Sequence, residues 1–511
     1  MGGTSVSLVR RTFVGVIVAL VVGGAAAGAQ AGSAPAARLT PVDSANRWVD
    51  SIFAPYSSTS SPGCAVGVVR DGQLAFAKGY GMADLEHDTP ITPSTRFYIA
   101  SLSKQFTAMS IVLLAQEGRL SLDDWVRRWV PQVPSFGSPI TLRQLLHHTS
   151  GLRDYFTLLA LSGWPSDGLL TESQFIDLVS RQKSLNFTPG DEFLYSNTGY
   201  ALLAMVVERA SGQSLRDYAA DHIFKPLGMT HTEFRDDHTQ LIPHRAVGYQ
   251  PTASGYRISQ PELDVVGDGG VYSTIEDLAK WDANFESGRV GGRDGVAELE
   301  EPGRLNNGQA IPYALALTVG DMAGMSTFSH RGAYGGYRSA MLMIPSRRLS
   351  VISLCNTSGA PTTLVDQVAT IHLGLIPRQR AVAAAAATRA IDFSAGPFSV
   401  GTASTAGDST IARKRNDQLT QLAGEFYSPE LDLAVSLVPR EGILLLRRPH
   451  ESDLRFVTFT TDLFTNNDQM LLRVVRNERG AVNGFTLSIN RVRDLEFVKR
   501  PADRSVPFWQ F

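Results

Sequence analysis

Ser101 and Lys104 are the two residues of this sequence whose types and spacing best suit chemistry. Three positions apart in a helix, their side chains lie on one face, about one turn from each other. A serine hydroxyl is a weak nucleophile at neutral pH, and a nearby amine that burial keeps neutral can take its proton. The pair therefore predicts nucleophilic catalysis through an acyl-enzyme.

The same pattern occurs a second time, at Ser180 and Lys183. Ser180 ends a short apolar segment and is followed by a turn at residues 186–190, which offers no buried helix for a neutral lysine. Ser101 instead opens a helix-like apolar stretch at residues 106–114. We therefore expect the first copy to be functional and the second to be a solvated helix end.

Tyr195 and Asn197 form a second group of candidates, between a turn at Pro189-Gly190 and a helix-like stretch at residues 200–207. A tyrosine near a lysine can be held partly as phenolate, and it can then carry the proton of the serine to a leaving group. The Asn197 amide could hold Lys104 and a substrate carbonyl. A turn with a packed tyrosine is the alternative interpretation.

A third group is His330-Arg331-Gly332-Ala333, which leads through a glycine-rich turn into a strand-like segment at residues 337–343. Glycine permits close backbone approach, as a substrate added along an edge strand requires. In that geometry the N–H groups of Ser101 and Ala333 would form an oxyanion hole. Taken alone, the segment could also be an ordinary glycine-rich turn.

In this order, the three groups resemble the class C β-lactamase and D-amino-acid peptidase superfamily, peptidase family S12. The resemblance extends from about Ser61 to Leu375. Five further segments belong to it: Pro62-Gly63, residues 145–152, residues 226–229, residues 269–274 and residues 277–281.

The resemblance implies specific roles. Ser101 would be the nucleophile, Lys104 the base, Tyr195 the proton carrier and Asn197 a positioning residue, with no cofactor required. His330 stands where many relatives have lysine and some have histidine, and Arg331 stands where a hydroxyl residue is frequent in β-lactamases.

That departure bears on the substrate. A missing hydroxyl weakens the case for a dedicated β-lactamase, although Arg331 or Arg338 could bind a carboxylate with two hydrogen bonds instead. The expected substrates are D-amino-acid peptides or amides, or small esters. A β-lactamase or penicillin-binding carboxypeptidase and a non-catalytic cell-wall or β-lactam binding protein are the alternatives.

The expected fold is α/β (α+β). Strand patterns near residues 64–80 and 339–356 bracket a long helical stretch, which predicts an antiparallel sheet flanked by helices with a mainly helical insertion. We expect a catalytic domain at residues 38–378, with its site between the sheet and the helical part, and a linker rich in Ala, Ser, Thr and Gly at residues 379–418.

The remaining segment, residues 419–511, predicts a small antiparallel barrel-like β-domain, similar to the lipocalin-like domains of some relatives. Six strand-like runs support it: residues 431–438, 443–447, 454–459, 470–476, 484–489 and 495–497.

The N-terminal residues 1–31 predict an export signal, with Arg10-Arg11, an apolar run at residues 13–22 and a cleavage site at Ala27-Gly28-Ala29. Ordinary secretion and twin-arginine export both remain open. Either route would make the protein periplasmic or extracellular. No later segment is long and apolar enough to span a bilayer.

Composition adds three expectations. The 511 residues carry a formal net charge of −2, which gives no sign of nucleic-acid binding. The two cysteines, Cys64 and Cys355, lie in strand-like runs and could form a disulfide or remain buried thiols. His147 and His148 diverge on a helix, so packing or capping is expected there and no metal site is predicted.

Overall fold

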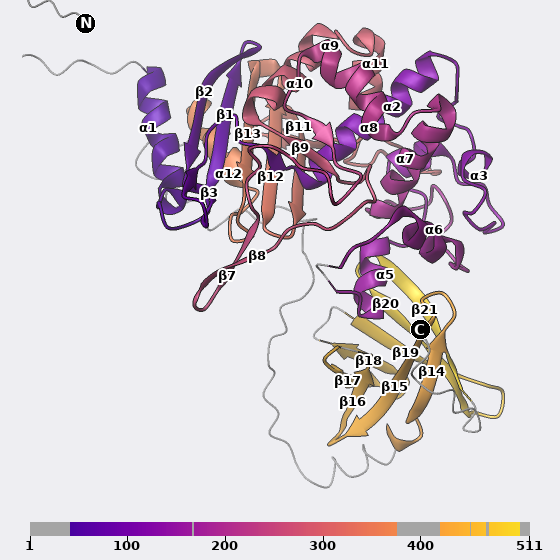
Figure 1. Cartoon of the computed structure of the whole chain (residues 1–511). Helices are drawn as coiled ribbons and strands as arrows, with labels where there is room; N and C mark the ends of the chain where they lie inside the picture. Colours follow the sequence, from indigo (N-terminus) through magenta and orange to yellow (C-terminus); the bar gives the residue numbers. More distant parts are fainter. Residues whose placement is uncertain (1–40, 166–167, 376–418, 450, 467–469, 501–511) are drawn as a thin grey trace, which may run out of the picture. The chain divides into compact units, whose positions relative to one another are not determined.

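A computed structural model describes residues 41–165, 168–375, 419–449, 451–466 and 470–500 (Figure 1). The expected signal at residues 1–31 and the expected linker at residues 379–418 lie outside the described residues, so both stay predictions. Among the helices that are described, none is long and apolar enough to cross a membrane.

The central feature is a six-stranded antiparallel sheet with the order β10-β11-β12-β13-β1-β2 (Figure 1). Its strands are β1 (Cys64–Arg70), β2 (Gln73–Tyr80), β10 (Thr318–Met322), β11 (Met325–Tyr334), β12 (Tyr337–Ile344) and β13 (Leu349–Cys355). The first strand pairs with the last, so the chain leaves and re-enters one sheet around its helical insertion. This confirms the antiparallel sheet that the sequence predicts.

Side chains on β1 alternate between two layers of core. Cys64, Val66 and Val68 pack with α1 (Pro41–Phe53) and α12 (Leu364–His372) on one face. Ala65 and Val69 face the larger core on the other side. Burial on both faces explains why β1 is apolar without interruption.

The two cysteines face each other directly in the β1–β13 register, and they are joined as a disulfide. Both are almost fully buried. Of the two alternatives that the sequence left open, the structure contains the disulfide.

The insertion is mainly helical. Its helices are α2 (Lys104–Gln116), α3 (Val126–Trp129), α4 (Leu142–Leu146), α5 (Tyr155–Ser162), α6 (Glu172–Ser180), α7 (Asn197–Ser211), α8 (Leu215–Ala219), η3 (Ala220–Phe224), α9 (Lys225–Leu227), α10 (Ile275–Ser287) and α11 (Gly292–Glu300). Helix α10 packs on β1 and β13, and α2 packs on α7. α2 is buried on nearly all sides, as an apolar helix without a polar face must be.

Three small sheets of short strands lie outside the central sheet. They are β3 (Met82–Asp84) with β4 (Thr89–Pro90), β5 (Phe97–Tyr98) with β9 (Val271–Ser273) and β6 (Glu233–Phe234), and β7 (Tyr249–Thr252) with β8 (Gly255–Ile258). β5 leads directly into the one-turn helix η2 (Ala100–Ser103), which carries Ser101.

The C-terminal region is a closed barrel of eight antiparallel strands. They are β14 (Gly424–Ser428), β15 (Leu433–Arg440), β16 (Ile443–Arg447), β17 (Leu454–Thr460), β18 (Leu463–Asn466), β19 (Met470–Arg476), β20 (Val482–Ile489) and β21 (Val492–Lys499). The predicted β-domain is confirmed, but β14 and β18 were not predicted. Both are only four or five residues long, too short for a clear alternation.

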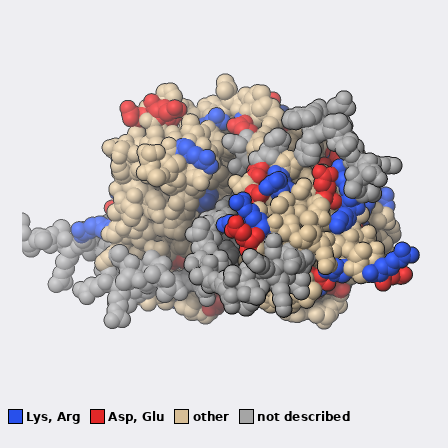
Figure 2. All heavy atoms as spheres, turned by 90° about the horizontal axis from the view of Figure 1, so that it is seen from below, with Lys and Arg blue, Asp and Glu red and all other residues tan. Residues whose placement is uncertain are grey.

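Charges of both signs lie next to each other on the face seen in Figure 2. Among the described residues, charges of opposite sign form ion pairs, such as Arg128 with Asp124 and Arg447 with Asp453. This mixed surface agrees with the net charge of −2.

Candidate active site

Ser101 lies in the single turn η2, immediately before the buried helix α2. The preceding Ala100 has a positive φ of 48°. This left-handed conformation costs a residue with a β-carbon about 1 kcal/mol, and such strain is typical of sharp turns that present a functional side chain. Hydrogen bonds fix the turn, since Ile99 N donates to Val271 O at 2.9 Å and Val271 N donates to Ser103 Oγ at 3.1 Å.

Lys104 begins α2 and has no solvent exposure. Its Nζ lies 3.2 Å from Ser101 Oγ, 2.8 Å from Asn197 Oδ1 and 2.6 Å from the backbone oxygen of Asp268. An ammonium has three N–H donors, so these three oxygens satisfy it completely. The structure therefore brings together Ser101, Lys104 and Asn197 as the sequence predicts.

The orientation of the Asn197 amide is set by Asp154. The Asp154 Oδ2 atom accepts hydrogen bonds from Asn197 N and Asn197 Nδ2, both at 2.8 Å. Because Nδ2 points to the carboxylate, Oδ1 must point to Lys104. Asp154 is itself the N-cap of α5 and has an exposure of 1%.

These contacts determine where a proton can move. Asn197 Oδ1 and the Asp268 carbonyl can only accept hydrogen bonds, whereas the Ser101 hydroxyl can also donate one. When Lys104 is a neutral amine, its lone pair must therefore face Ser101. This is the arrangement that a general base for the serine requires.

Asp268 sits in a loop that is tied to α2, because Thr107 Oγ1 donates to Gly267 O at 2.8 Å. Its carboxyl group accepts a hydrogen bond from Tyr155 Oη at 3.0 Å. Burial raises the pKa of Asp268 to about 6, although Lys104 and Tyr155 oppose the rise.

Tyr195 lies beside the lysine, with Lys104 Nζ 5.1 Å from the centre of its ring. Its exposure is 6%. The His148 ring lies 4.0 Å from it, centre to centre. The structure thus places Tyr195 in the same cluster as Ser101 and Lys104.

His330 joins this cluster from β11 as a neutral ring. Its Nδ1 lies 2.9 Å from Arg331 O and its Nε2 lies 2.9 Å from Tyr313 Oη. Burial, together with the charge of Lys104, lowers the pKa of His330 to about 3. A carbonyl only accepts, so Nδ1 carries the proton and Nε2 accepts from Tyr313.

Gly332 brings β11 directly against η2. A β-carbon at this position would lie 2.5 Å from Ile99 O and 3.0 Å from Ser101 N, so any larger residue would push the strand away. The strand backbone that continues into Ala333 therefore runs next to the Ser101 N–H group. This is the close approach that the sequence predicted for an oxyanion hole.

The structure does not bring Arg331 into the cluster. Its guanidinium pairs with Asp366 of α12 at 2.7 Å. Neighbouring residues of a strand point to opposite faces, so when His330 faces the site Arg331 faces α12. Arg338 lies opposite Cys355 in the β12–β13 register, on the same α12 face. A role in substrate binding is therefore unsupported for either arginine.

Several residues of the cluster were not predicted as site residues: His148, Asp154, Asp268 and Tyr313. His148 lies within a segment that carries the resemblance and Asp268 directly precedes another, but nothing in the local pattern marks their roles. The packing role expected for His148 is observed, and its Nδ1 accepts a hydrogen bond from Ser196 N at 3.2 Å.

A protein-family model described as beta-lactamase matches residues 12–374. The chain belongs to the beta-lactamase family. This assignment agrees with the Ser101, Lys104 and Tyr195 cluster described above.

Curated relatives in the beta-lactamase family include a D-aminopeptidase of Gluconobacter oxydans (strain 621H), 31% identical over 317 residues. That match covers 61% of this chain and 59% of the relative, so the chain spans about three fifths of its length. A penicillin-binding protein of Bacillus subtilis (strain 168) is 33% identical over 300 residues, or 56% of this chain and 66% of the relative.

Solved structures show the same fold. An octameric penicillin-binding protein homologue from Pyrococcus abyssi has a TM-score of 0.57 at 23% identity, covering 90% of this chain and 100% of that chain. A penicillin-binding protein from Bacillus halodurans has a TM-score of 0.55 at 25% identity, covering 64% and 99%.

Proposed function

We propose that this protein is an exported serine hydrolase that forms an acyl-enzyme at Ser101 and acts on D-amino-acid peptides, D-amino-acid amides or small esters. One observation carries the proposal: buried Lys104 has three oxygen neighbours, and Ser101 is the only one of the three that can give it a proton. The D-aminopeptidase relative supports the substrate class.

Acylation would begin when Lys104 takes the Ser101 proton and Oγ attacks the substrate carbonyl carbon. The carbonyl electrons move to oxygen, where the N–H groups of Ser101 and Ala333 stabilise the negative charge. The intermediate then collapses and its bond to the leaving group breaks. Tyr195 gives its phenolic proton to the departing amine or alkoxide and takes the proton held by Lys104 in its place.

Deacylation would reverse the roles with water in place of the leaving group. Water gives a proton to the Tyr195 and Lys104 pair while its oxygen attacks the ester carbon. Ser101 Oγ leaves and recovers the proton, and the free acid departs. Lys104 and the cluster return to their starting protonation.

Two observations support export. The sequence pattern at residues 1–31 is typical of a signal peptide. The Cys64–Cys355 disulfide also suits an oxidising compartment such as the periplasm or the extracellular space.

The test is intact-mass spectrometry of the purified full chain after mixing with a p-nitrophenyl ester, a D-alanine p-nitroanilide or a penicillin. We expect an acyl adduct that is absent in Ser101→Ala and present in the matched control Ser180→Ala. An adduct in Ser101→Ala would contradict the proposed nucleophile.

The lifetime of the adduct distinguishes the alternatives. A short-lived adduct with ester or anilide and release of product supports the proposed hydrolase. A penicillin adduct that persists would indicate a penicillin-binding carboxypeptidase, and rapid penicillin hydrolysis would indicate a β-lactamase. Binding of all three compounds without any adduct would indicate a non-catalytic binding protein.

A further inference from the structure

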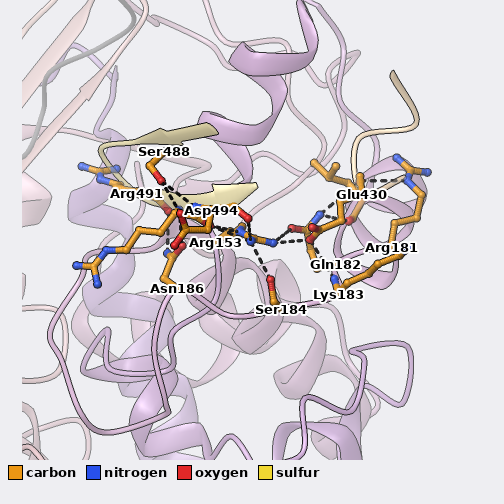
Figure 3. A network of polar contacts seen from close by, with 12 residues as sticks. Arg153, Arg181, Gln182, Lys183, Ser184, Asn186, Glu430, Ser488, Arg491 and Asp494 are labelled. Carbon is orange, nitrogen blue, oxygen red and sulfur yellow. Dashed lines mark hydrogen bonds and ion pairs between the residues drawn. The ribbon is translucent and has the colours of Figure 1, made fainter. Parts of the chain in front are cut away.

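The hairpin between β20 and β21 of the barrel reaches the edge of the candidate site. Ile489 pairs with Val492, so Asn490 and Arg491 form the two-residue turn, and Asn490 adopts the positive φ of 43° that such tight turns require. Asn186 Nδ2 donates to Arg491 O at 2.9 Å (Figure 3). Asp154 N donates to the same oxygen at 3.3 Å.

A buried ion pair holds the barrel at this point. Arg153 pairs with Glu430, which follows β14, and their side chains are only 0% and 1% exposed. Arg153 Nη2 also donates to Arg493 O at 2.8 Å, and Lys183 N donates to Glu430 Oε2 at 3.0 Å (Figure 3). Buried charges are tolerated only when they are paired in this way, so the pair defines where the barrel docks.

The side chain of Arg491 then points at two members of the candidate site. Its guanidinium carbon lies 4.8 Å from the centre of the Tyr195 ring. Its Nη1 lies 3.8 Å from Asp154 Oδ2, and the two side chains are 14% and 1% exposed. A cation over an aromatic face and a cation near a buried carboxylate are both favourable contacts.

Asp154 transmits this contact to the base. The same Oδ2 atom accepts both hydrogen bonds of Asn197, whose Oδ1 holds Lys104 Nζ at 2.8 Å. The neighbouring guanidinium of Arg153 is turned to Glu430. Arg491 is therefore the arginine that faces the buried charge of Asp154 from the barrel side.

We infer that Arg491 is a positioning residue of the Ser101 site, supplied by the C-terminal barrel. This inference rests on the proposed function. Arg491 holds the Asp154 carboxylate in place, so that Asn197 and Lys104 remain aligned with Ser101, and it fixes the ring of Tyr195. Through this residue the barrel is part of the catalytic machinery as well as a neighbouring domain.

Three variants of the full chain test the inference. Arg491→Met removes the charge and keeps the length of the side chain, and Arg491→Lys keeps the charge but loses the planar fork. Arg493→Met is the matched control on the same hairpin, because the Arg493 guanidinium pairs with Glu192 at 2.9 Å and both side chains are well exposed.

The main measurement is the rate at which a fluorophosphonate modifies Ser101, with release of fluoride, followed by intact mass. We expect Arg491→Met to react about 10-fold to 100-fold more slowly than the wild type, because a small misalignment of reacting groups has effects of this size. Arg491→Lys should recover part of the rate. Arg493→Met should react within about two-fold of the wild type.

Steady-state kinetics with the best ester or anilide give a second readout. A positioning residue acts through Lys104 and Tyr195, so its loss should lower kcat and leave KM nearly unchanged. Circular dichroism and thermal unfolding of each variant establish that it is folded. If Arg491→Met fails to fold, the labelling rate and kcat of Arg491→Lys are compared with those of Arg493→Met, and a larger loss in Arg491→Lys supports the inference.

A wild-type labelling rate and a wild-type kcat in folded Arg491→Met would overturn the inference. An equal loss of both in Arg493→Met would also overturn it, because it would show that the hairpin matters and the Arg491 guanidinium does not. If the wild type itself is not modified at Ser101, the proposed function has failed and this inference fails with it. Labelling of the wild type together with an unaffected Arg491→Met would refute this inference alone.

Discussion

Two segments of the chain have the same Ser-x-x-Lys pattern and differ in every physical respect that matters for catalysis. Ser101 lies in η2 and Lys104 begins the buried helix α2. Ser180 is the last residue of α6, and Lys183 lies beyond the helix, with both side chains exposed. In the second segment Ser180 Oγ donates to Asp177 O at 2.8 Å, a helix-end contact.

The difference shows that spacing alone does not create an activated nucleophile. Burial makes the charged form of a lysine costly, and only specific acceptors can offset that cost. Lys104 has such acceptors in Asn197 and Asp268, brought from two other parts of the chain. Lys183 is exposed, and water can solvate its amine.

The largest expected effect comes from exchanging the two lysines for methionine. Lys104→Met removes the proposed base, and we expect kcat/KM to fall by about 1,000-fold or more, as loss of a general base does. Lys183→Met should stay within about two-fold of the wild type. Hydrolysis of a chromogenic ester by both purified variants measures the contrast.

Similar losses in both variants would contradict the distinction between the two segments. The comparison requires that Lys104→Met is folded, because an apolar side chain in this position leaves Asn197 Oδ1 and Asp268 O without their donor. Thermal unfolding and circular dichroism provide this control.

The second prediction concerns the partner that only the first segment has. Asn197→Ala removes one acceptor of Lys104 and the hydrogen bond from Asn197 Nδ2 to the buried Asp154 carboxylate, whereas the bond from the backbone N–H of residue 197 remains. We expect kcat to fall about 10-fold to 100-fold. The free energy of unfolding should fall by about 1 to 3 kcal/mol, the usual cost of unsatisfied buried polar groups.

Asn197→Asp serves as the companion variant. It keeps the size of the side chain but places a second carboxylate against Asp154, so it should be at least as harmful as Asn197→Ala. Full activity in Asn197→Asp would contradict the amide orientation described above.

Much of this site could be predicted from the sequence, because some of its residues are close together in the chain and its motifs follow the order seen in the family that the chain resembles. Ser101 and Lys104 are one helical turn apart, and the glycine at position 332 marks a close approach. Asp154 and Arg491 could not be predicted in the same way. The role of Asp154 depends on its contact with Asn197, 43 residues away, and that of Arg491 depends on packing between segments more than 300 residues apart, such as Asn186 with the hairpin of Arg491.

The position of Arg331 has a different cause. The sequence places the segment His330-Arg331-Gly332 beside Ser101, but neighbouring side chains of a strand point to opposite faces. Because His330 faces the site, Arg331 must face α12, where Asp366 binds it. The barrel strands were mostly predicted for the opposite reason, since their alternation is regular.

The third prediction uses the protonation of the buried cluster around Lys104. The pKa of His330 is lowered to about 3, so between pH 6.5 and pH 4 its unfolded form takes up a proton that the folded form does not. The folded state therefore loses stability as the pH falls through this range. In His330→Gln the drop in unfolding free energy from pH 6.5 to pH 4.5 should be smaller by about 2 kcal/mol.

Urea unfolding at several pH values measures this slope. His87 provides the contrast, because Asp84 raises the pKa of this exposed side chain. Its stabilising contribution is present below its unfolded pKa and is lost as the pH rises through the folded pKa, so His87→Gln should change the slope in the opposite direction. Identical slopes in wild type and His330→Gln would contradict a neutral His330.

The smallest expected effect is that of Ser180→Ala. The exposed Ser180 hydroxyl donates only to the carbonyl of Asp177 among the contacts of the described residues, at the end of a helix where water can replace it. We expect the unfolding free energy to change by less than about 0.5 kcal/mol and kcat/KM to remain at the wild-type value. Denaturant unfolding and ester hydrolysis measure both quantities in one preparation. A substantial loss of activity in folded Ser180→Ala would mean that the second Ser-x-x-Lys segment takes part in catalysis, and the contrast between burial and exposure would no longer explain which copy works.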